Sequence, residues 1–544
     1  MSASTAVHSG PLVRSELTGT LALLRLAWRR DRILIPASAL GLTVLSVGSA
    51  KATLDLYPTA SAVEAGVAEL FSNPAVTALY GPVAAMTPDA LAVIKTVMLG
   101  AVGLGILAYA VVRRHTRTEE EEGRFELLGS GSVGRWAPLT AAILLSTLTV
   151  VGISLLSTIG LAGIGMDPVG SLALGVAWMV SGLFMVGVTA VAAQLTTTAR
   201  GCAGISFGVL AAAYILRAMG DAATTDAGRA LSWVSPLGWS IKVSAYGANR
   251  SWLLLPAAAL AAALVAVAFA LLERRDLGAG LLAGRPGTPR AGRLLGSPAG
   301  LSWRLNRPSV IGWTVLAVVL AGVLGNLVSS ISALTTNPAV ARMLQSLGGS
   351  AGTLEDIFFS TELRFAAAAA TAAGISAALR MAAEERATHA EVLLAGPTSR
   401  RRFYVSHATA ALLLPLWVMV LVGAVAGLVG HRLDASAPGV GALVAASLAT
   451  LPAVWLIIAL TLLLFGLAGR WAPFGWGLLA VAFLLGEFGA LMNLPQWLID
   501  VSPYVHVSQL PGGSFAATPS LVMTFLALLA ALAGALAFRR RDVG

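Results

Sequence analysis

The sequence contains little charge. Its 544 residues include 36 Lys and Arg and 26 Asp and Glu, so that 11% of the chain is charged. Soluble globular domains carry about 25% charged residues. The apolar fraction of 57% is far above the disordered range, and Gly and Pro follow no short period. These features exclude soluble, disordered and collagen-like classes, and a polytopic membrane protein remains.

Cysteine and lysine are also scarce. The single cysteine, Cys202, cannot form an intrachain disulfide, and one isolated cysteine does not indicate a metal site, so we interpret it as a small apolar residue. None of the three lysines, Lys51, Lys95 and Lys242, follows a glycine, so the chain lacks a phosphate-binding P-loop. The net charge of +10 comes from Arg dispersed between apolar runs, and no basic domain suits a nucleic acid.

Long apolar runs are abundant. A membrane helix needs about 20 mainly apolar residues, and the runs predict twelve spans. We expect them at 33–50, 90–112, 138–162, 170–195, 201–219, 252–272, 309–332, 358–380, 407–430, 438–466, 472–492 and 519–538. Residues 1–20 lack the apolar region of a signal peptide, so we expect the first span to be retained.

Basic residues predict the orientation. Arg clusters lie beside span ends, for example Arg29–Arg30, Arg113–Arg114, Arg274–Arg275 and Arg539–Arg541. All of them face the cytoplasm if the N-terminus does, as the positive-inside rule requires. We therefore expect a multi-pass protein of the inner (plasma) membrane with both termini in the cytoplasm.

Short strings recur in order along the two halves of the chain. Each recurs about 265–275 positions later, as the sequence shows. The pairs are Trp28-Arg29 with Trp303-Arg304, Asn73-Pro74-Ala75-Val76 with Asn337-Pro338-Ala339-Val340, Glu119-Glu120 with Glu384-Glu385, Val234-Ser235-Pro236 with Val501-Ser502-Pro503, and Arg274-Arg275-Asp276 with Arg540-Arg541-Asp542. Five pairs in register predict a duplicated structure.

The repeat predicts the domain organisation. Each copy holds six spans, an even number, so the two halves should run in parallel and be related by a pseudo-twofold axis along the membrane normal. We expect an all-α protein with a first six-helix half at 1–272, including an N-terminal interfacial helix, and a second at 309–544. A Gly-, Pro- and Arg-rich cytoplasmic linker with a second interfacial segment, 273–308, joins them.

The N-terminal interfacial helix is predicted from Leu17, Leu21, Leu24 and Trp28, which form an apolar stripe opposite several Arg. Its role stays open between a mechanistic element and an ordinary membrane anchor.

The first cytoplasmic loop of each half is rich in charge. A helix there would present a charged surface to water and end in an apolar pair near Gly129 or Gly396, which suits docking by another protein. The alternative is a solvated face beside the lipid headgroups. The candidate docking residues are Glu119, Glu120, Glu121, Glu122, Arg124 and Glu126 in the first half and Glu384, Glu385, Arg386, His389 and Glu391 in the second.

Ionisable groups inside spans are candidates for function because burying them in a membrane is costly. Arg217 and Glu487 lie near the outer ends of the two fifth spans, where a salt bridge between the halves could close an outer gate; independent solvation is the alternative. Lys95 and Arg364, near the outer ends of the second spans, are expected to extend to water. Phe207, Tyr214, Phe483, Phe488 and Met492 could line a pathway, or serve packing and lipid contact.

The residues Glu119 to Leu128, the segment Glu391 to Pro397 and the two Arg-Arg-Asp ends carry a family resemblance. Over nearly its whole length the chain resembles the permeases of ABC-2-type exporters, particularly the fused twelve-span polyketide-antibiotic exporters of the tetronasin-resistance type. The second copy departs from the pattern, with Ala387-Thr388-His389-Ala390 where the first has Glu122-Gly123-Arg124-Phe125.

The resemblance implies a transport subunit that is not itself an enzyme. Two copies of a separate ATPase, which bind ATP and Mg²⁺, would dock on the first cytoplasmic loops, and this chain would bind no cofactor or metal. The substrate cleft would lie between the second and fifth spans of each half, and the cargo would be hydrophobic drugs or antibiotics, conferring multidrug efflux.

Two other classes of protein compete with this interpretation. A proton-coupled secondary multidrug carrier would need a relay of carboxylates at the middle of the membrane, and Glu487 lies near one end of its span. A membrane transferase would need convergent acid or base residues, whereas Asp and Glu are scattered.

Overall fold

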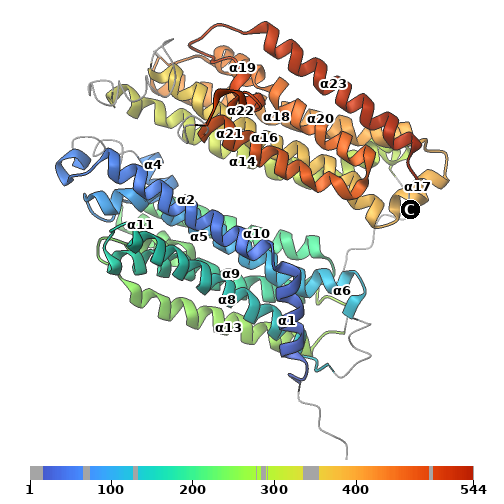
Figure 1. Ribbon diagram of the computed structural model, residues 1–544. Coiled ribbons are helices and arrows are strands. Elements are labelled where there is room, and N and C mark those ends of the chain that lie inside the picture. Colours follow the sequence, from blue (N-terminus) through green and yellow to red (C-terminus); the bar gives the residue numbers. More distant parts are fainter. Residues whose placement is uncertain are drawn as a thin grey trace, which may run out of the picture. The chain divides into compact units, whose positions relative to one another are not determined.

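The chain divides into two compact units, Met1–Pro286 and Gly287–Gly544 (Figure 1). The computed structural model describes residues 16–64, 74–125, 133–223, 225–276, 278–282, 290, 292–334, 354–435, 437–488 and 494–542. The boundary between the units falls inside the segment 273–308 that the sequence predicts to be a linker.

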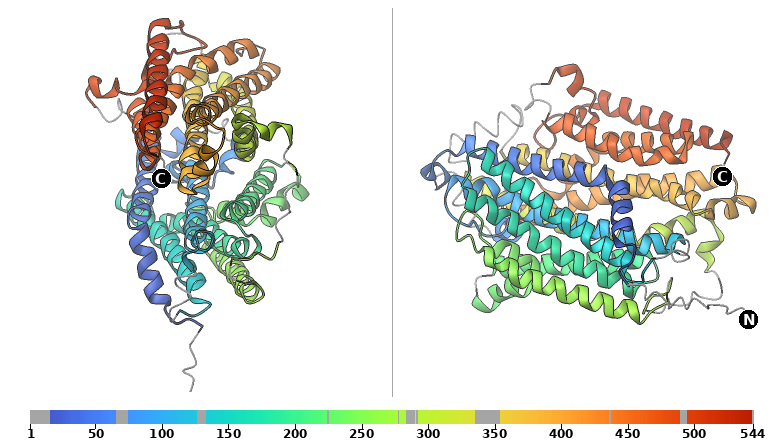
Figure 2. Two further views of the ribbon diagram at one scale, coloured as in Figure 1. Left: turned by 90° about the vertical axis from the view of Figure 1, so that its right-hand side faces the viewer. Right: turned by 60° about the horizontal axis from the view of Figure 1, so that its bottom comes forward.

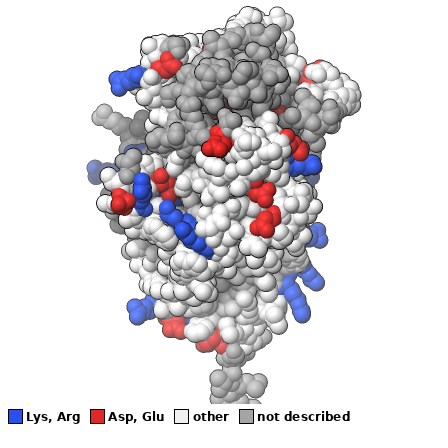
Figure 3. Space-filling view, turned by 90° about the vertical axis from the view of Figure 1, so that its left-hand side faces the viewer, with Lys and Arg blue, Asp and Glu red and all other residues white. Residues whose placement is uncertain are grey.

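All secondary structure in the described ranges is helical, which confirms the all-α class. Eleven of these helices are long and apolar enough to cross a membrane, by length and composition. Figure 3 shows one face of the molecule, where single charged side chains are scattered over a mostly uncharged surface. The chain is therefore a polytopic helical membrane protein.

The first unit is built around α9. Its helices are α1 (Thr20–Asp31), α2 (Leu34–Leu56), α4 (Pro74–Tyr80), α5 (Pro88–Arg113), α6 (Glu119–Glu121), α8 (Ala137–Gly163), α9 (Pro168–Leu195), α10 (Ala199–Ala222), α11 (Asp226–Val234), α12 (Pro236–Lys242) and α13 (Leu254–Glu273). Helix α9 packs against α5, α8 and α13 (Figure 2). Small residues permit this packing, because a side chain at Gly100 of α5 would collide with Trp178 of α9.

Local sequence signals explain where the long helices begin. The Thr87 hydroxyl accepts from the Ala90 N–H before α5, with Pro88 at the first helical position. Asp167 caps α9 in the same way, also before a proline. Such caps satisfy N–H groups that have no partner within the helix.

The described part of the second unit holds five of the eleven candidate spans. Its helices are α14 (Pro298–Leu334), α16 (Leu354–Arg386), α17 (His389–Ala395), α18 (Arg400–Leu433), α19 (Val440–Ala449), α20 (Leu451–Leu467), α21 (Gly475–Phe488), α22 (Gln496–Ile499) and α23 (Ala517–Arg540). Helix α18 packs against α14 and α16, and α20 packs against α23. How the two units are oriented to one another in the membrane stays a prediction from the even number of spans.

Three features differ from the expected spans. The expected span 472–492 appears as α21, Gly475–Phe488, preceded by a 3₁₀ turn, and residues 489–493 lie outside the described ranges. The second interfacial segment and the seventh span form one helix, α14, with Pro308 inside it. Helix α5 continues through a π-helical turn, Arg114–Thr118, into α6. Such π turns are frequent at functional sites.

Candidate functional site

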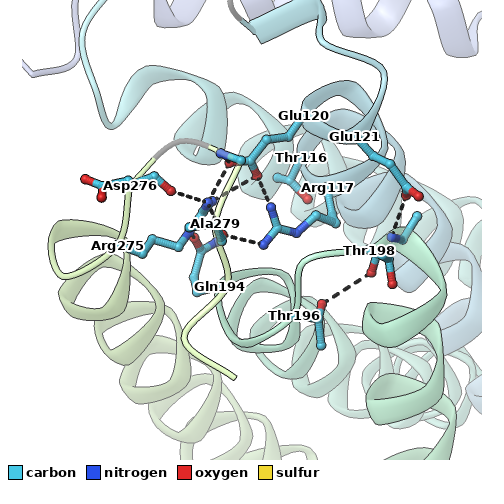
Figure 4. A network of polar contacts seen from close by, with 12 residues as sticks. Thr116, Arg117, Glu120, Glu121, Gln194, Thr196, Thr198, Arg275, Asp276 and Ala279 are labelled. Atoms are coloured by element: carbon cyan, nitrogen blue, oxygen red, sulfur yellow. Dashed lines mark hydrogen bonds and ion pairs between the residues drawn. The ribbon is translucent and has the colours of Figure 1, made fainter. Parts of the chain in front are cut away.

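A buried carboxylate, Glu120, joins the segment after α5 to the segment after α13 at one end of the first unit. We call this the basal end, where α1, the C-terminal ends of α5, α9 and α13, and the start of α8 come together; the opposite end is the distal end. Glu120 accepts hydrogen bonds from Arg117 at 2.7 Å and from Arg275 at 2.5 and 3.0 Å (Figure 4). The backbone N–H of Gly278 donates to the same carboxylate at 2.7 Å.

The two arginines extend this network to neighbouring helices. The Arg275 Nε donates to the side chain of Gln194, the penultimate residue of α9, at 2.7 Å, and Arg117 donates to the Ala279 carbonyl at 2.7 Å. Arg135, at the start of α8, donates to the carbonyls of Leu272 and Arg275. The network therefore fixes the ends of four membrane-spanning helices relative to one another.

A second group of ion pairs ties α1 to the same end. Glu119 pairs with Arg30 at 2.5 Å and with Arg124 at 2.7 Å. The hydrogen bond from Arg124 to Glu119 raises the pKa of the Arg124 guanidinium. Asp31, which is fully buried, pairs with Arg114 at 2.6 Å and lies 2.7 Å from the His115 ring nitrogen. The N-terminal helix is thus anchored to this end by charge, whereas Leu17, Leu21 and Trp28 of its predicted apolar stripe are exposed.

The expectation of a wholly water-facing charged surface is wrong for three of the predicted residues. Glu119, Glu120 and Glu384 are 5%, 9% and 7% exposed. Glu119 and Glu120 are neutralised by Arg30 and Arg275 from the ends of distant helices, which the linear sequence does not show. Glu384 is paired within its own segment. A buried carboxylate of this kind positions its neighbours and is not free to contact a partner.

The remaining docking candidates have different surroundings. The exposed ones are Glu121, Glu122, Arg386, His389 and Glu391, whereas Arg124 and Glu385 are partly exposed. Glu121 accepts from the Ala199 N–H at 2.7 Å and so caps the N-terminus of α10. Glu126 and Gly129 lie outside the described residues. Gly396 ends α17, as the sequence predicted for a helix stop.

The second unit repeats the main contact at the corresponding positions. Glu385 accepts from Arg541 at 2.7 Å, as Glu120 accepts from Arg275. Arg400 donates to the carbonyls of Arg539 and Arg541, in the way that Arg135 holds the end of α13. The sequence repeat therefore extends to side-chain contacts within each unit.

The two networks are not identical. Asn306 occupies the position that corresponds to Asp31, and Leu305 occupies that of Arg30. Glu384 pairs instead with Arg380 at 3.1 Å and with His389 at 3.0 Å, both within its own segment. The ties between the acidic segment and the preceding interfacial helix are therefore a feature of the first half.

Arg217 lies in a polar cluster at the distal end of the first unit. It is fully buried, donates to the Leu79 carbonyl at 3.2 Å and lies 3.5 Å from Asp221. Tyr214 donates to the same carbonyl, and its ring lies 4.5 Å from the guanidinium carbon. Asp221 also accepts from Ser232 at 2.6 Å. Arg217 therefore has partners in its own half.

Glu487 also has a partner in its own half. It pairs with Arg364 of α16 at 2.7 Å, and their side chains are 8% and 21% exposed. The expectation that Arg364 simply extends to water is therefore wrong, while Lys95 is exposed as expected. The predicted pair of Arg217 with Glu487 would have to replace these contacts, and it stays a prediction.

Two of the aromatic residues predicted to line a pathway, Phe207 and Phe483, lie on the fifth spans. Each contacts an aromatic ring of the second span in its own half. The rings of Phe207 and Tyr109 lie 4.7 Å apart, between α10 and α5. The rings of Phe483 and Phe365 lie 5.1 Å apart, between α21 and α16. Phe207 is 42% exposed. The Phe488 side chain and Met492 lie outside the described residues.

Sequence reasoning missed Arg117, Gln194 and Arg275 as members of the basal network. One signal was present: Glu120 and Arg275 each recur about 265 positions later, as Glu385 and Arg541. Two repeated residues of opposite charge at matching offsets indicate a repeated contact.

The described helices and the charged groups at their ends place the chain among multi-pass helical membrane proteins. The chain is 41% identical over 546 residues to the multidrug efflux system permease protein Rv1217c of Mycobacterium tuberculosis, covering 99% of this chain and 98% of that protein. Residues 295–539 also match the family described as multidrug efflux system permease Rv1217c, C-terminal domain. The chain therefore belongs to the Rv1217c-like family of multidrug efflux permeases.

Proposed function

We propose that this permease is the membrane subunit of an ABC-2-type exporter, driven by two copies of a separate ATPase. One copy docks at the basal end of the first half, and the other docks at the end of the second half where α17 follows α16. The cargo would be hydrophobic drugs or antibiotics, moved out of the cytoplasm. ATP and Mg²⁺ would bind to the partner, since the sequence holds no P-loop. The orientation with both termini in the cytoplasm belongs to the same proposal.

The basal network supports this proposal most directly. Glu119 and Glu120 are held to α1 and to the end of α13, while Glu122 beside them has a half-exposed side chain. A partner that displaces α6 would therefore also displace the span ends that are ion-paired to it, because buried ion pairs resist separation. In the second half, the exposed residues Arg386 and Glu391 are the corresponding docking candidates.

The contacts between second and fifth spans support the expected pathway. The aromatic pairs join α5 with α10 and α16 with α21. A pathway between these spans would open or close when the C-terminal ends of α5 and α16 move. Because α5 continues directly into the π turn and α6, the docking segment and the second span form one mechanical element.

Charge reversal tests the docking assignment. Glu122→Arg should lower substrate-stimulated ATP hydrolysis by a co-expressed ATPase by about tenfold or more, since mismatched charge at an interface costs several kcal/mol. Asp226→Arg is the matched control, because Asp226 is an exposed carboxylate at the distal end. It should leave ATP hydrolysis unchanged.

Two outcomes would contradict the proposal. Equal effects of both reversals, with normal amounts of folded permease in the membrane, would remove the docking assignment. Transport that stops when the proton gradient is dissipated while ATP is abundant would favour the proton-coupled carrier.

A further inference from the structure

The second unit has an open groove whose counterpart among the described residues of the first unit is much smaller. It holds about 720 Å³ and lies between the first turns of α14 and of α18. In the first unit, the cavity between α1 and α8 that corresponds in sequence holds about 30 Å³, because Leu23, Leu26 and Ala27 pack near Pro138 and Ala141.

One end of the groove is basic. Arg401 and Arg402 line it, are exposed, and form no ion pair with any residue in the described part of the chain. The corresponding positions of the first half hold Trp136 and Ala137, so this pair of charges is specific to the second half. Two unpaired arginines at one end of a groove favour an anionic occupant.

Helix starts add to the positive character of that end. Both α14 and α18 begin there, and Ser297 and Ser399 cap them by accepting from the Gly300 and Arg402 N–H groups. The positive end of each helix dipole therefore faces the same region as the two arginines.

The rest of the groove is mainly apolar. Trp303 of α14 and Val405, Ala410 and Leu413 of α18 line it, and Trp303, Val405 and Leu413 are about half exposed. From Ser399 to Leu413 the α18 axis rises about 20 Å, at 1.5 Å per residue. This matches half the thickness of a bilayer including its headgroup regions, about 20–22 Å. Tryptophan is typical of the boundary between headgroups and acyl chains.

We propose that this groove binds an anionic phospholipid, with the phosphate at Arg401 and Arg402 and an acyl chain along Val405 and Leu413. A soluble phosphate would not use the apolar part, and a zwitterionic lipid would leave the excess positive charge unbalanced. Basic pockets between membrane helices recognise anionic headgroups in this way. The proposal needs only the membrane class of the protein and does not depend on the ATPase partner.

Binding of tail-labelled phosphatidylglycerol to the purified full-length chain in detergent tests the proposal. Arg401→Gln together with Arg402→Gln should weaken binding about thirtyfold. This corresponds to about 2 kcal/mol at 1.4 kcal/mol per factor of ten, since each basic residue at an anionic membrane surface contributes about 1 kcal/mol. Unlabelled phosphatidylglycerol should compete at least tenfold better than phosphatidylcholine.

Two further variants separate this site from general surface charge. Arg539→Gln with Arg540→Gln removes the same charge from two exposed residues at the end of α23, outside the groove, and should leave binding unchanged. Ala410→Trp fills the apolar part without changing charge and should also weaken binding. Because Arg401 and Arg402 are exposed, their replacement is expected to leave the fold intact.

Several results would overturn the proposal. These are equal losses in the two double arginine variants, equal competition by phosphatidylcholine, and competition by glycerol phosphate as strong as that by the lipid. Unchanged binding in folded Ala410→Trp protein, or a cross-link showing residues 283–291 of the chain itself in the groove, would also overturn it.

Discussion

Glu120 and Arg275 lie 155 positions apart in the sequence and form an ion pair with Oε1 and Nη1 separated by 2.5 Å. Their side chains are 3% and 6% exposed. The contact joins the segment after the second span to the end of the sixth span, so it holds together two span ends that are far apart in the sequence. The pair of Glu385 with Arg541 does the same in the second half.

Replacing Glu120 by Gln should destabilise the protein. The change leaves Arg117 and Arg275 buried without a neutralising charge, and breaking a buried ion pair costs about 3–5 kcal/mol. Unfolding of the purified chain in a detergent–denaturant titration measures the loss. Glu122→Gln, at a half-exposed carboxylate, is the control and should cost about 0.5 kcal/mol or less. Equal losses would show that Glu120 is solvated in the folded protein.

Ser235→Ala and Ser502→Ala should have similar effects. Each buried hydroxyl donates at 2.6 Å to a carbonyl in the fifth span of its own half, Ala213 or Ala482. Loss of such a contact costs about 1–3 kcal/mol, measurable as a lower unfolding free energy. Ser514→Ala, at an exposed serine, should be close to neutral. A large effect in one half alone would contradict a repeated tertiary contact.

Gly100→Ala should separate α5 from α9. A Cβ at Gly100 would lie 1.9 Å from the Cε2 of Trp178, which is itself buried and donates to the Thr96 carbonyl. Overpacking of this kind costs about 1–3 kcal/mol or more. Gly152→Ala in α8 is the matched control, because nothing lies within 4 Å of the added methyl group. It should be neutral or slightly stabilising, since Ala favours helix more than Gly.

Arg217 and Asp221 should be energetically coupled. Both side chains are fully buried and 3.5 Å apart, so the double variant Arg217→Gln with Asp221→Asn should lose less stability than the sum of the single variants. Contacting buried groups show coupling of about 0.5–3 kcal/mol. Additive losses would mean that the two residues are stabilised independently.

The same cycle, performed on transport activity with Arg217→Gln and Glu487→Gln, tests the predicted gate between the halves. Coupling there, together with coupling of Arg217 to Asp221 in stability, would mean that Arg217 exchanges partners during transport. Additive effects on transport would dismiss the gate.

Much of the fold was predictable because hydropathy is a local property. Runs of about 20 apolar residues placed eleven spans close to the observed helices, and α1 was expected from its apolar stripe. The continuation of the linker's last part into α14 was not predicted, because a proline usually marks a helix boundary. Pro308 instead lies inside this helix. The π turn at Arg114–Thr118 has no sequence signal that we used.

The sequence predicted where the candidate site lies along the chain, but it did not predict which of its side chains are buried or paired. The repeated acidic segments were correctly singled out as rich in charge, but Glu119, Glu120 and Glu384 proved to be buried. Arg364 was expected to extend to water and instead pairs with Glu487. In each case the partner lies on a segment distant in sequence, apart from Glu384, whose partners are its near neighbours Arg380 and His389.

The amino-acid sequence by itself determined that this chain spans a membrane many times, and it predicts that the second half repeats the first, since both inferences rest on residues in linear order. Only the tertiary structure decided which charges neutralise one another and which stay exposed, including Arg401 and Arg402 beside the groove. The physical reason is that ion pairing depends on which helix ends converge. That convergence is settled by packing along whole helices, as at Gly100 and Trp178, and not by the sequence near the charges.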